Sequence, residues 1–280
     1  MTNEDKRSTA ARVAAEKALV NVVYHYGSCP EFVVLGGLIP AILCSKSKNR
    51  HAGTTDVDVQ VDLEIAKDAV NTKNLENALK KSGFQPSDTG IWRWVTENQR
   101  PKVEVKFELL ADLGTQPNQA IIKFDDCEQL GAVNLRGTGY ASIDKRQTNL
   151  KGEVAGQIQE VTINITGIGG FILAKAAAAY SRRKTKDWYD IAFVILNNDD
   201  DSEPLQLATS IKEKFKGKLT SEILTAIRDL KSNFENENCQ GSIAFGEQYL
   251  FDHPHEDAAT AKADSIVAVT SLCDGLLVQD

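Results

Sequence analysis

The sequence predicts an α+β fold, in which a small mixed sheet is followed by a helical C-terminal part. Short apolar runs of strand type, among them EFVVL and KVEVKFELL, are concentrated before residue 111. From about Ile168 onward, apolar residues recur at helical spacing through GGFILAKAAAAYSRRK and KDWYDIAFVIL. For a chain of 280 residues we therefore expect two domains, a sheet-containing core over residues 1–160 and a helical domain over residues 161–280.

The N-terminal elements alternate between helix and strand. Apolar residues at helical spacing predict a helix over residues 9–26. EFVVL then forms a short buried strand that Gly36 and Gly37 break, and Pro40 suits the first turn of a helix. The polar loop SKSKNRHAG leads into DVDVQVDL, in which aspartates or glutamine alternate with apolar residues, the period of a half-buried strand.

After residue 70, some segments have a clear helix or strand pattern and others have none. A helix is expected over residues 72–81, followed by the strands IWRWV and KVEVKFELL. Residues 111–160 are rich in Gly, Asn and Gln and predict only short strands and loops. After the two C-terminal helices already quoted, NNDDDSEP is an acidic linker, and the remainder predicts further amphipathic helices.

Composition limits the class of protein. A formal charge of −7 argues against a protein that coats nucleic acid through a basic surface. Five widely separated cysteines without a CxxC spacing indicate reduced thiols, rather than a disulfide framework or a zinc site. The N-terminal segment lacks the apolar region of a signal peptide, and no stretch approaches the ~20 apolar residues that a membrane-spanning helix needs. We expect a cytoplasmic protein without a membrane segment.

Asp56 and Asp58 are the strongest candidates for chemistry. Successive strand side chains point to opposite faces, so these two carboxylates share a face with α-carbons ~6.5–7 Å apart and can reach one hard cation. Mg²⁺ takes oxygen ligands and typically combines one or two carboxylates with substrate phosphates. A third acidic ligand is expected from a neighbouring strand, and Glu104 of KVEVKFE is the best supply, with Glu108 as the alternative. The other interpretation of the aspartates is the solvated face of an antiparallel sheet.

About twenty residues upstream, Gly36 and Gly37 close a buried strand and open a helix, where backbone N–H groups can approach a triphosphate. Together with the following Gly-Thr-x-Asp-Val-Asp, which contains Thr54, this pair resembles the signature of the nucleotidyltransferase superfamily, as in polymerase-β-like enzymes. Three features depart from that signature. The basic residue that relatives often place two positions before the Gly-Thr is displaced, since this chain has Arg50, His51 and Ala52 there. The spacer between Gly37 and Asp56 is about five residues longer than the family pattern, and the third carboxylate is Glu where Asp is commoner.

A second block, ILAKAAAAYSRRKTKDWYDIAFVI, resembles the helical motif of the AbiEii/AbiGii toxin-type nucleotidyltransferases. The positions that match are Lys175, Ala178, Arg182 or Arg183, Lys186, Asp187 and Asp190. Lys175 and Arg182 are two helical turns apart and project from one face, where they can offer positive charge to phosphates. Asp187 and Asp190 share a face of the next helix and can hold Lys175 by an ion pair. The alternative is a structural helix hairpin laced with salt bridges.

The resemblance implies a polymerase-β-like mixed sheet and the transfer of a nucleoside monophosphate from an NTP to an acceptor hydroxyl, with pyrophosphate leaving. It implies that Asp56, Asp58 and Glu104 bind Mg²⁺ or Mn²⁺ and that Glu104 helps to activate the hydroxyl. The residues implied to bind the nucleotide are Gly36, Gly37, Thr54, Lys175 and Arg182. Lys175 would neutralise the departing charge, with Asp190 positioning it.

The biology that the resemblance implies is a toxin or phage-defence component, with tRNA or another RNA as acceptor and a separate protein antitoxin. A basic stripe could carry the RNA. Its members would be Lys175, Arg182, Arg183, Lys184 and Lys186. Two alternatives stay open: a non-catalytic nucleotide sensor or protein-binding partner of the same fold, and a nucleotidyltransferase acting on small molecules. Of the four histidines, only His51 lies near the aspartate pair, and we expect it on an exposed loop.

Overall fold

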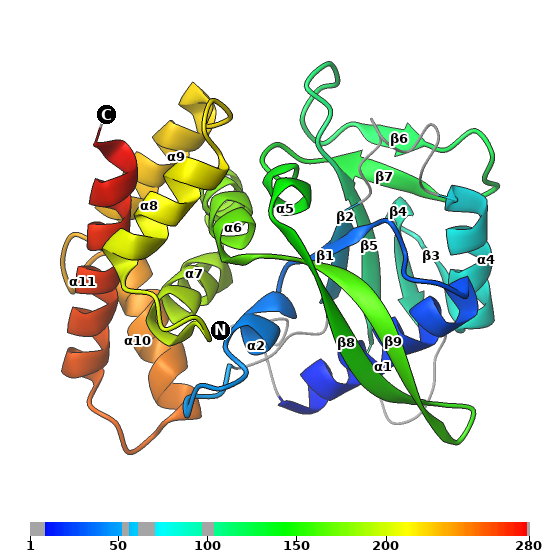
Figure 1. Cartoon of the computed structure of the whole chain (residues 1–280), viewed down its shortest axis with the longest axis horizontal. Helices are drawn as coiled ribbons and strands as arrows, with labels where there is room; N and C mark the ends of the chain where they lie inside the picture. Colours follow the sequence, from blue (N-terminus) through cyan, green and yellow to red (C-terminus); the bar gives the residue numbers. More distant parts are fainter. Residues whose placement is uncertain (1–8, 52–55, 61–70, 97–103, 279–280) are drawn as a thin grey trace. The chain divides into compact units, whose positions relative to one another are not determined.

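The computed structural model describes residues 9–51, 56–60, 71–96 and 104–278, with the backbone alone for Thr9, Ala10, Asp56–Gln60 and Asp252. It divides the chain into two compact units (Figure 1). The sheet unit comprises Met1–Ile39 and Gly53–Thr166, and the helical unit comprises Pro40–Ala52 and Gly167–Asp280. The predicted α+β class is confirmed. The expected domains, residues 1–160 and 161–280, differ from these units in two ways. Pro40–Ala52 belong to the helical unit, and the later boundary lies between Thr166 and Gly167.

The sheet unit contains a mixed sheet of nine strands within the described residues. The strands are β1 (Val33–Leu35), β2 (Asp56–Gln60), β3 (Phe84–Ser87), β4 (Gly90–Thr96), β5 (Lys106–Ala111), β6 (Ile121–Lys123), β7 (Gly131–Asn134), β8 (Lys145–Val154) and β9 (Gln157–Thr166). The main order is β3-β4-β5-β2-β1-β9-β8, and β7 pairs with both β5 and β6. Three pairs are parallel, β1 with β9, β2 with β5 and β5 with β7, and the others are antiparallel.

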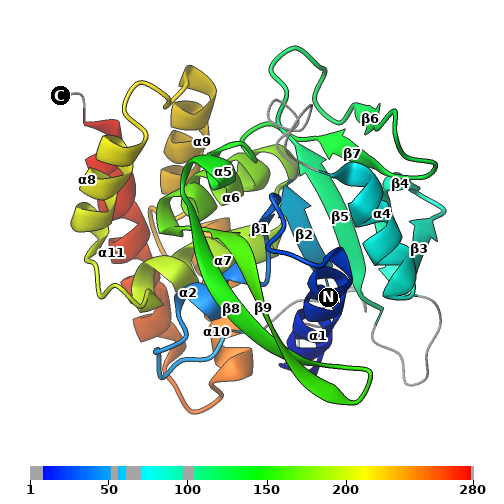
Figure 2. The same ribbon diagram turned by 45° about the vertical axis from the view of Figure 1, so that its right-hand side comes forward.

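Two helices cover one face of this sheet. Figure 2 shows α1 (Thr9–Tyr26) and α4 (Thr72–Lys81) side by side, with α1 against the β8–β9 hairpin and α4 next to β3. The helix expected over residues 72–81 is confirmed, and the Asn71 side chain caps its N-terminus. Leu19, Leu79 and Phe107 are fully buried, so the apolar face of each helix joins the sheet in one core. The short helix α5 (Tyr140–Ile143) precedes β8.

The β8–β9 hairpin differs from the expectation of short strands and loops over residues 111–160. Two ten-residue strands pair along their full length, from Lys145 with Thr166 to Val154 with Gln157. The two residues of the loop, Ala155 and Gly156, both have positive φ, the backbone that a two-residue hairpin turn requires. Most side chains of β8 are at least partly exposed, so the strand lacks the apolar alternation that would have predicted it.

The helical unit is built around α7. Its longer helices are α6 (Ile168–Arg182), α7 (Thr185–Asn197), α8 (Pro204–Lys214), α9 (Ser221–Ser232), α10 (Gln240–Asp252) and α11 (Ala258–Leu277), and α2 (Ile39–Leu43) leads into its N-terminal segment. The helix α7 packs against α6, α10 and α11, and residues 187–195 of it are all buried. The predicted helices at residues 169–184 and 186–196 therefore correspond to α6 and α7. Among the described residues, no helix has both the length and the apolarity needed to cross a bilayer.

Candidate functional site

In the sheet unit, backbone pairing brings the glycine turn next to the aspartate strand. The antiparallel register of β1 and β2 pairs Leu35 with Asp58. The next residue is Gly36, whose φ of 85° lies in the left-handed region that favours glycine. The Gly36 carbonyl accepts a hydrogen bond from the N–H of Ile39 at 3.2 Å, which closes the turn. The two motifs singled out in the sequence, about twenty residues apart, are therefore adjacent in the sheet.

The same sheet gives the position of a third carboxylate. The strands β2 and β5 are parallel, and their register pairs Asp58 with Glu108 and Asp56 with Lys106. Paired residues of neighbouring strands lie on the same face, so Glu108 is level with Asp58 in one row. Glu104 lies before β5 begins, and its side chain is 61% exposed, 4.0 Å from the Lys106 ammonium. The register thus favours Glu108, the alternative, over the expected Glu104.

Glu108 has a cationic partner on its other side. The Arg93 guanidinium lies 2.6 Å from the Glu108 carboxylate across the β4–β5 pair, and the Glu108 side chain is 14% exposed. Arg93 also lies over the Trp92 ring, 4.5 Å from its centroid. A guanidinium held in this way stabilises the ionised form of a half-buried carboxylate. Any cation bound at Glu108 would therefore share this carboxylate with Arg93.

Three residues at these register positions are acidic, and Lys106 is paired with Asp56 in the same row. Asp56, Asp58 and Glu108 would supply only carboxylate oxygens, the ligands that Mg²⁺ and Mn²⁺ prefer. The side chains of Asp56 and Asp58, and Thr54 altogether, lie outside the described residues. Among the side chains that are described, no group of three His, Cys, Asp or Glu residues could hold a metal ion.

The helical unit contains a second cluster, which we call the buried ion network and which consists of His51, Lys175, Arg182, Asp187 and Asp190. The Lys175 ammonium lies 2.9 Å from an Asp187 oxygen and 2.8 Å from an Asp190 oxygen. Arg182 donates from Nε and Nη2 to both oxygens of Asp187, at 2.6 and 2.7 Å. The predicted ion pairs between Lys175 and the two aspartates are confirmed.

Burial makes these ion pairs mutually dependent. Both aspartates are fully buried, and Lys175 is 5% exposed. Burial alone would raise the pKa of Asp187, but the charges of Lys175 and Arg182 outweigh it and lower that pKa to about 2. Burial likewise opposes the charged form of Lys175, and the two carboxylates more than compensate, which raises its pKa above the ordinary value. Both groups are therefore ionised at neutral pH.

His51 is the member of the buried ion network that the sequence did not predict. The expectation of an exposed loop histidine is wrong, because His51 is 3% exposed. Its Nε2 lies 2.9 Å from Asp190, and its ring stacks on Tyr189 and meets Phe193 edge-on. The surrounding residues, CSKSKNRHAG, are polar, so no local apolar pattern signalled this burial.

The structure removes two of the five residues predicted for the basic stripe. Lys175 is buried and cannot belong to a surface stripe, and Arg182 is held by Asp187. Arg183 and Lys184 are exposed at the α6–α7 turn, where Arg183 also lies 2.8 Å from Asp229. Positive charge at this turn is therefore smaller than the sequence suggested.

Comparison with known proteins adds no relative to this description. No family model, no curated protein and no solved structure matches the chain. Its function is therefore inferred from its own residues and backbone register.

Proposed function

We propose that the chain is a metal-dependent nucleotidyltransferase, which moves a nucleoside monophosphate from an NTP to an acceptor hydroxyl. The observation that carries the proposal is the register of the sheet unit. It pairs Leu35 with Asp58 directly before the Gly36 turn, and it pairs Asp58 with Glu108 on the next strand. A glycine turn next to carboxylate residues in register would suit a triphosphate and its divalent cation.

The residues of this row would divide the reaction between them. The acceptor oxygen forms a bond to the α-phosphorus while the bond from that phosphorus to the bridging oxygen breaks, and pyrophosphate leaves. The hydroxyl proton passes to a carboxylate, for which Glu108 is the candidate in place of Glu104. Asp56 and Asp58 would hold Mg²⁺ or Mn²⁺, which when bound stabilises charge on the attacking and leaving oxygens. The turn of Gly36 and Gly37 would orient the triphosphate.

The buried ion network supports a positioning role for Lys175 and Asp190. A lysine that is 5% exposed and shared by two carboxylates has little ammonium surface to offer a phosphate. Asp190 also contacts His51, and the strand that carries Asp56 begins five residues after His51 along the chain. The network therefore holds His51 in the helical unit, and a positioning role for Lys175 and Asp190 would act through His51.

The proposed acceptor is RNA, with tRNA as the first molecule to test and a toxin or phage-defence role as the setting. Exposed Arg183 and Lys184 at the α6–α7 turn support contact with a phosphate backbone. Replacing both with glutamate should weaken RNA binding and leave NTP binding unchanged. Arg182 is left unchanged in this variant, because its loss would remove a hydrogen-bond donor from the buried Asp187. Unchanged RNA binding would count against this turn as the acceptor surface.

One observation favours a second candidate, a nucleotide sensor of the same fold without transfer activity. Both contacts of the Arg93 guanidinium with Glu108, at 2.6 Å, are to Oε1, so the charge of this carboxylate is already partly offset by a cation. If Glu108 does not take up the proton for that reason, the protein would bind NTP and transfer nothing.

The test is a transfer assay with each of the four α-labelled NTPs, Mg²⁺ or Mn²⁺, and tRNA, bulk protein or small hydroxyl compounds as acceptors. Label should enter one acceptor class and should be lost in Asp58→Asn and Glu108→Gln. Glu104→Gln is the matched control, since Glu104 lies before β5 and is mostly exposed. NTP binding without transfer would favour the sensor, and neither binding nor transfer would reject both candidates.

A further inference from the structure

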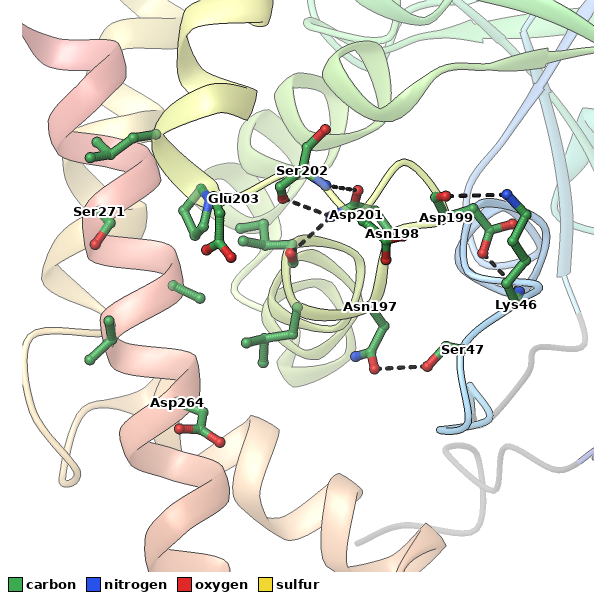
Figure 3. Close-up of a pocket in the computed structure, with 16 residues that line it drawn as sticks. Lys46, Ser47, Asn197, Asn198, Asp199, Asp201, Ser202, Glu203, Asp264 and Ser271 are labelled. Carbon is green, nitrogen blue, oxygen red and sulfur yellow. Dashed lines mark hydrogen bonds between the residues drawn. The ribbon is translucent and has the colours of Figure 1, made fainter.

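A hollow in the helical unit lies outside the residues to which the proposed function assigns a role. It has a volume of about 890 Å³ and is formed by the end of α7, the start of α8, one face of α11 and the loop at Lys46 (Figure 3). On α11 its lining includes Asp264, Val267 and Ser271, which are spaced three and four residues apart and therefore lie on one helical face. The hollow extends along about two turns of that helix.

Several apolar side chains in the hollow are exposed. Leu205 is 59% exposed, Val267 is 65% exposed and Leu196 is 37% exposed. All three line the hollow, together with Ile195, Pro204 and Ala268. Apolar side chains gathered in one concave surface and edged by polar groups are typical of a binding site for another molecule.

The edge of the hollow is acidic. Four carboxylates line it, those of Asp199, Asp201, Glu203 and Asp264, against the single ammonium of Lys46. Asp201, Glu203 and Asp264 are exposed. Asp199 accepts a hydrogen bond from the Lys46 N–H at 2.8 Å (Figure 3) and another from the Ser45 hydroxyl at 2.6 Å. These bonds outweigh burial and lower the pKa of Asp199, so it stays charged at neutral pH. An edge of this charge repels RNA and anionic lipid surfaces.

We propose that this hollow binds a basic amphipathic segment of a partner protein. Apolar side chains of the segment would cover Leu205 and Val267, while its Lys and Arg residues would face Asp201, Glu203 and Asp264. The apolar contacts would supply most of the affinity, and the charges would supply selectivity and a faster association rate. This proposal is independent of nucleotide transfer, because none of these residues belongs to the carboxylate row or to the buried ion network.

The test begins with selection of random 16-residue peptides displayed on phage against the immobilised full-length chain. Enriched peptides should carry Lys or Arg beside spaced apolar residues, and each should bind the free chain as a synthetic peptide. Leu205→Asp and Val267→Asp should each weaken binding by roughly tenfold or more. Ile158→Asp is the matched control, since Ile158 is 72% exposed in the sheet unit, and it should leave binding unchanged.

A second set of variants tests the charge of the edge. The combination of Asp201→Asn, Glu203→Gln and Asp264→Asn should weaken binding by roughly three- to tenfold at low salt, and by less at high salt. Its control neutralises three exposed acids that do not line the hollow. These are Asp200, Glu213 and Glu237. Equal effects of the two sets would show that net charge, rather than this edge, attracts the peptide.

Three further outcomes would overturn the proposal. They are the absence of enriched peptides, enriched peptides of neutral or acidic composition, and binding that persists in Leu205→Asp. Self-association of the chain that is abolished by Leu205→Asp would identify a second copy as the occupant. Circular dichroism of each variant shows whether loss of binding reflects loss of fold.

Discussion

Replacing Lys175 with methionine removes the shared cation of the buried ion network. Asp187 would keep Arg182, and Asp190 would keep His51, but the two carboxylates would lose the ammonium that lies 2.9 and 2.8 Å from them. Removing one partner of a buried ion pair typically costs about 3–5 kcal/mol, because the remaining charge is left in a medium of low dielectric constant. Since both aspartates retain another partner, we expect the low end of that range, about 3 kcal/mol.

The assay must report on the helical unit, because the chain has two units and its unfolding need not be a single transition. Hydrogen exchange of the amides of α6 and α7 gives the local opening free energy. Lys216→Met serves as the control, since Lys216 is exposed and lies between α8 and α9. Protection in α6 and α7 should fall in Lys175→Met and stay unchanged in the control.

A double variant separates electrostatics from packing. Adding Asp190→Asn to Lys175→Met removes one of the two carboxylates, so part of the lost stability should return. Two results would refute the reasoning. One is a loss below about 1 kcal/mol in Lys175→Met, the range of an exposed ion pair. The other is full additivity, in which the loss of stability in the double variant equals the sum of the losses in Lys175→Met and Asp190→Asn.

Three further predictions concern acid, the glycine turn and the third carboxylate. The folded-state pKa of Asp187 is about 2, and its ordinary value is 3.8. This carboxylate should therefore contribute roughly 2–3 kcal/mol to the free energy of unfolding above about pH 4, and that contribution should be lost as the pH falls to about 2. Asp187→Asn should flatten the pH dependence of unfolding across that window. Gly36→Ala should destabilise the sheet unit by about 1–2 kcal/mol in urea unfolding, because φ is 85° at Gly36. Gly37→Ala should destabilise it less. Equal losses in the two variants would show that the left-handed backbone at Gly36 is not the cause. Glu108→Gln should lower transfer by roughly tenfold or more and Glu104→Gln should not; the reverse order would restore the original assignment.

Elements with strong periodicity could be predicted from the sequence. The helix over residues 72–81 has Leu75, Ala78 and Leu79 at helical spacing, and all three are buried. The two helices of the Lys175 block combine long apolar runs with ends marked by polar residues. The ion pairs of Lys175 could be predicted as well, because residues three apart in α7 share a face. The helices depend on local spacing, and the ion pairs depend in addition on the packing of two consecutive helices, α6 and α7.

Features that depend on register or on distant contacts could not be predicted. The choice between Glu104 and Glu108 depends on where β5 begins and on its alignment with β2, and neither follows from composition. The burial of His51 depends on contacts with Tyr189 and Asp190, about 140 residues away, while its own neighbours are polar. The long β8–β9 hairpin was missed because its strands carry mostly polar residues.

The most direct test of the central claim is calorimetric binding of an NTP analogue whose α–β bridge cannot be cleaved. The backbone register of β1, β2 and β5 predicts binding that requires Mg²⁺ or Mn²⁺, that is lost in Asp58→Asn and that persists in Glu104→Gln. Binding of equal strength without a divalent cation, or in Asp58→Asn, would contradict the assignment of the carboxylate row, and so would the absence of binding by the unmodified chain.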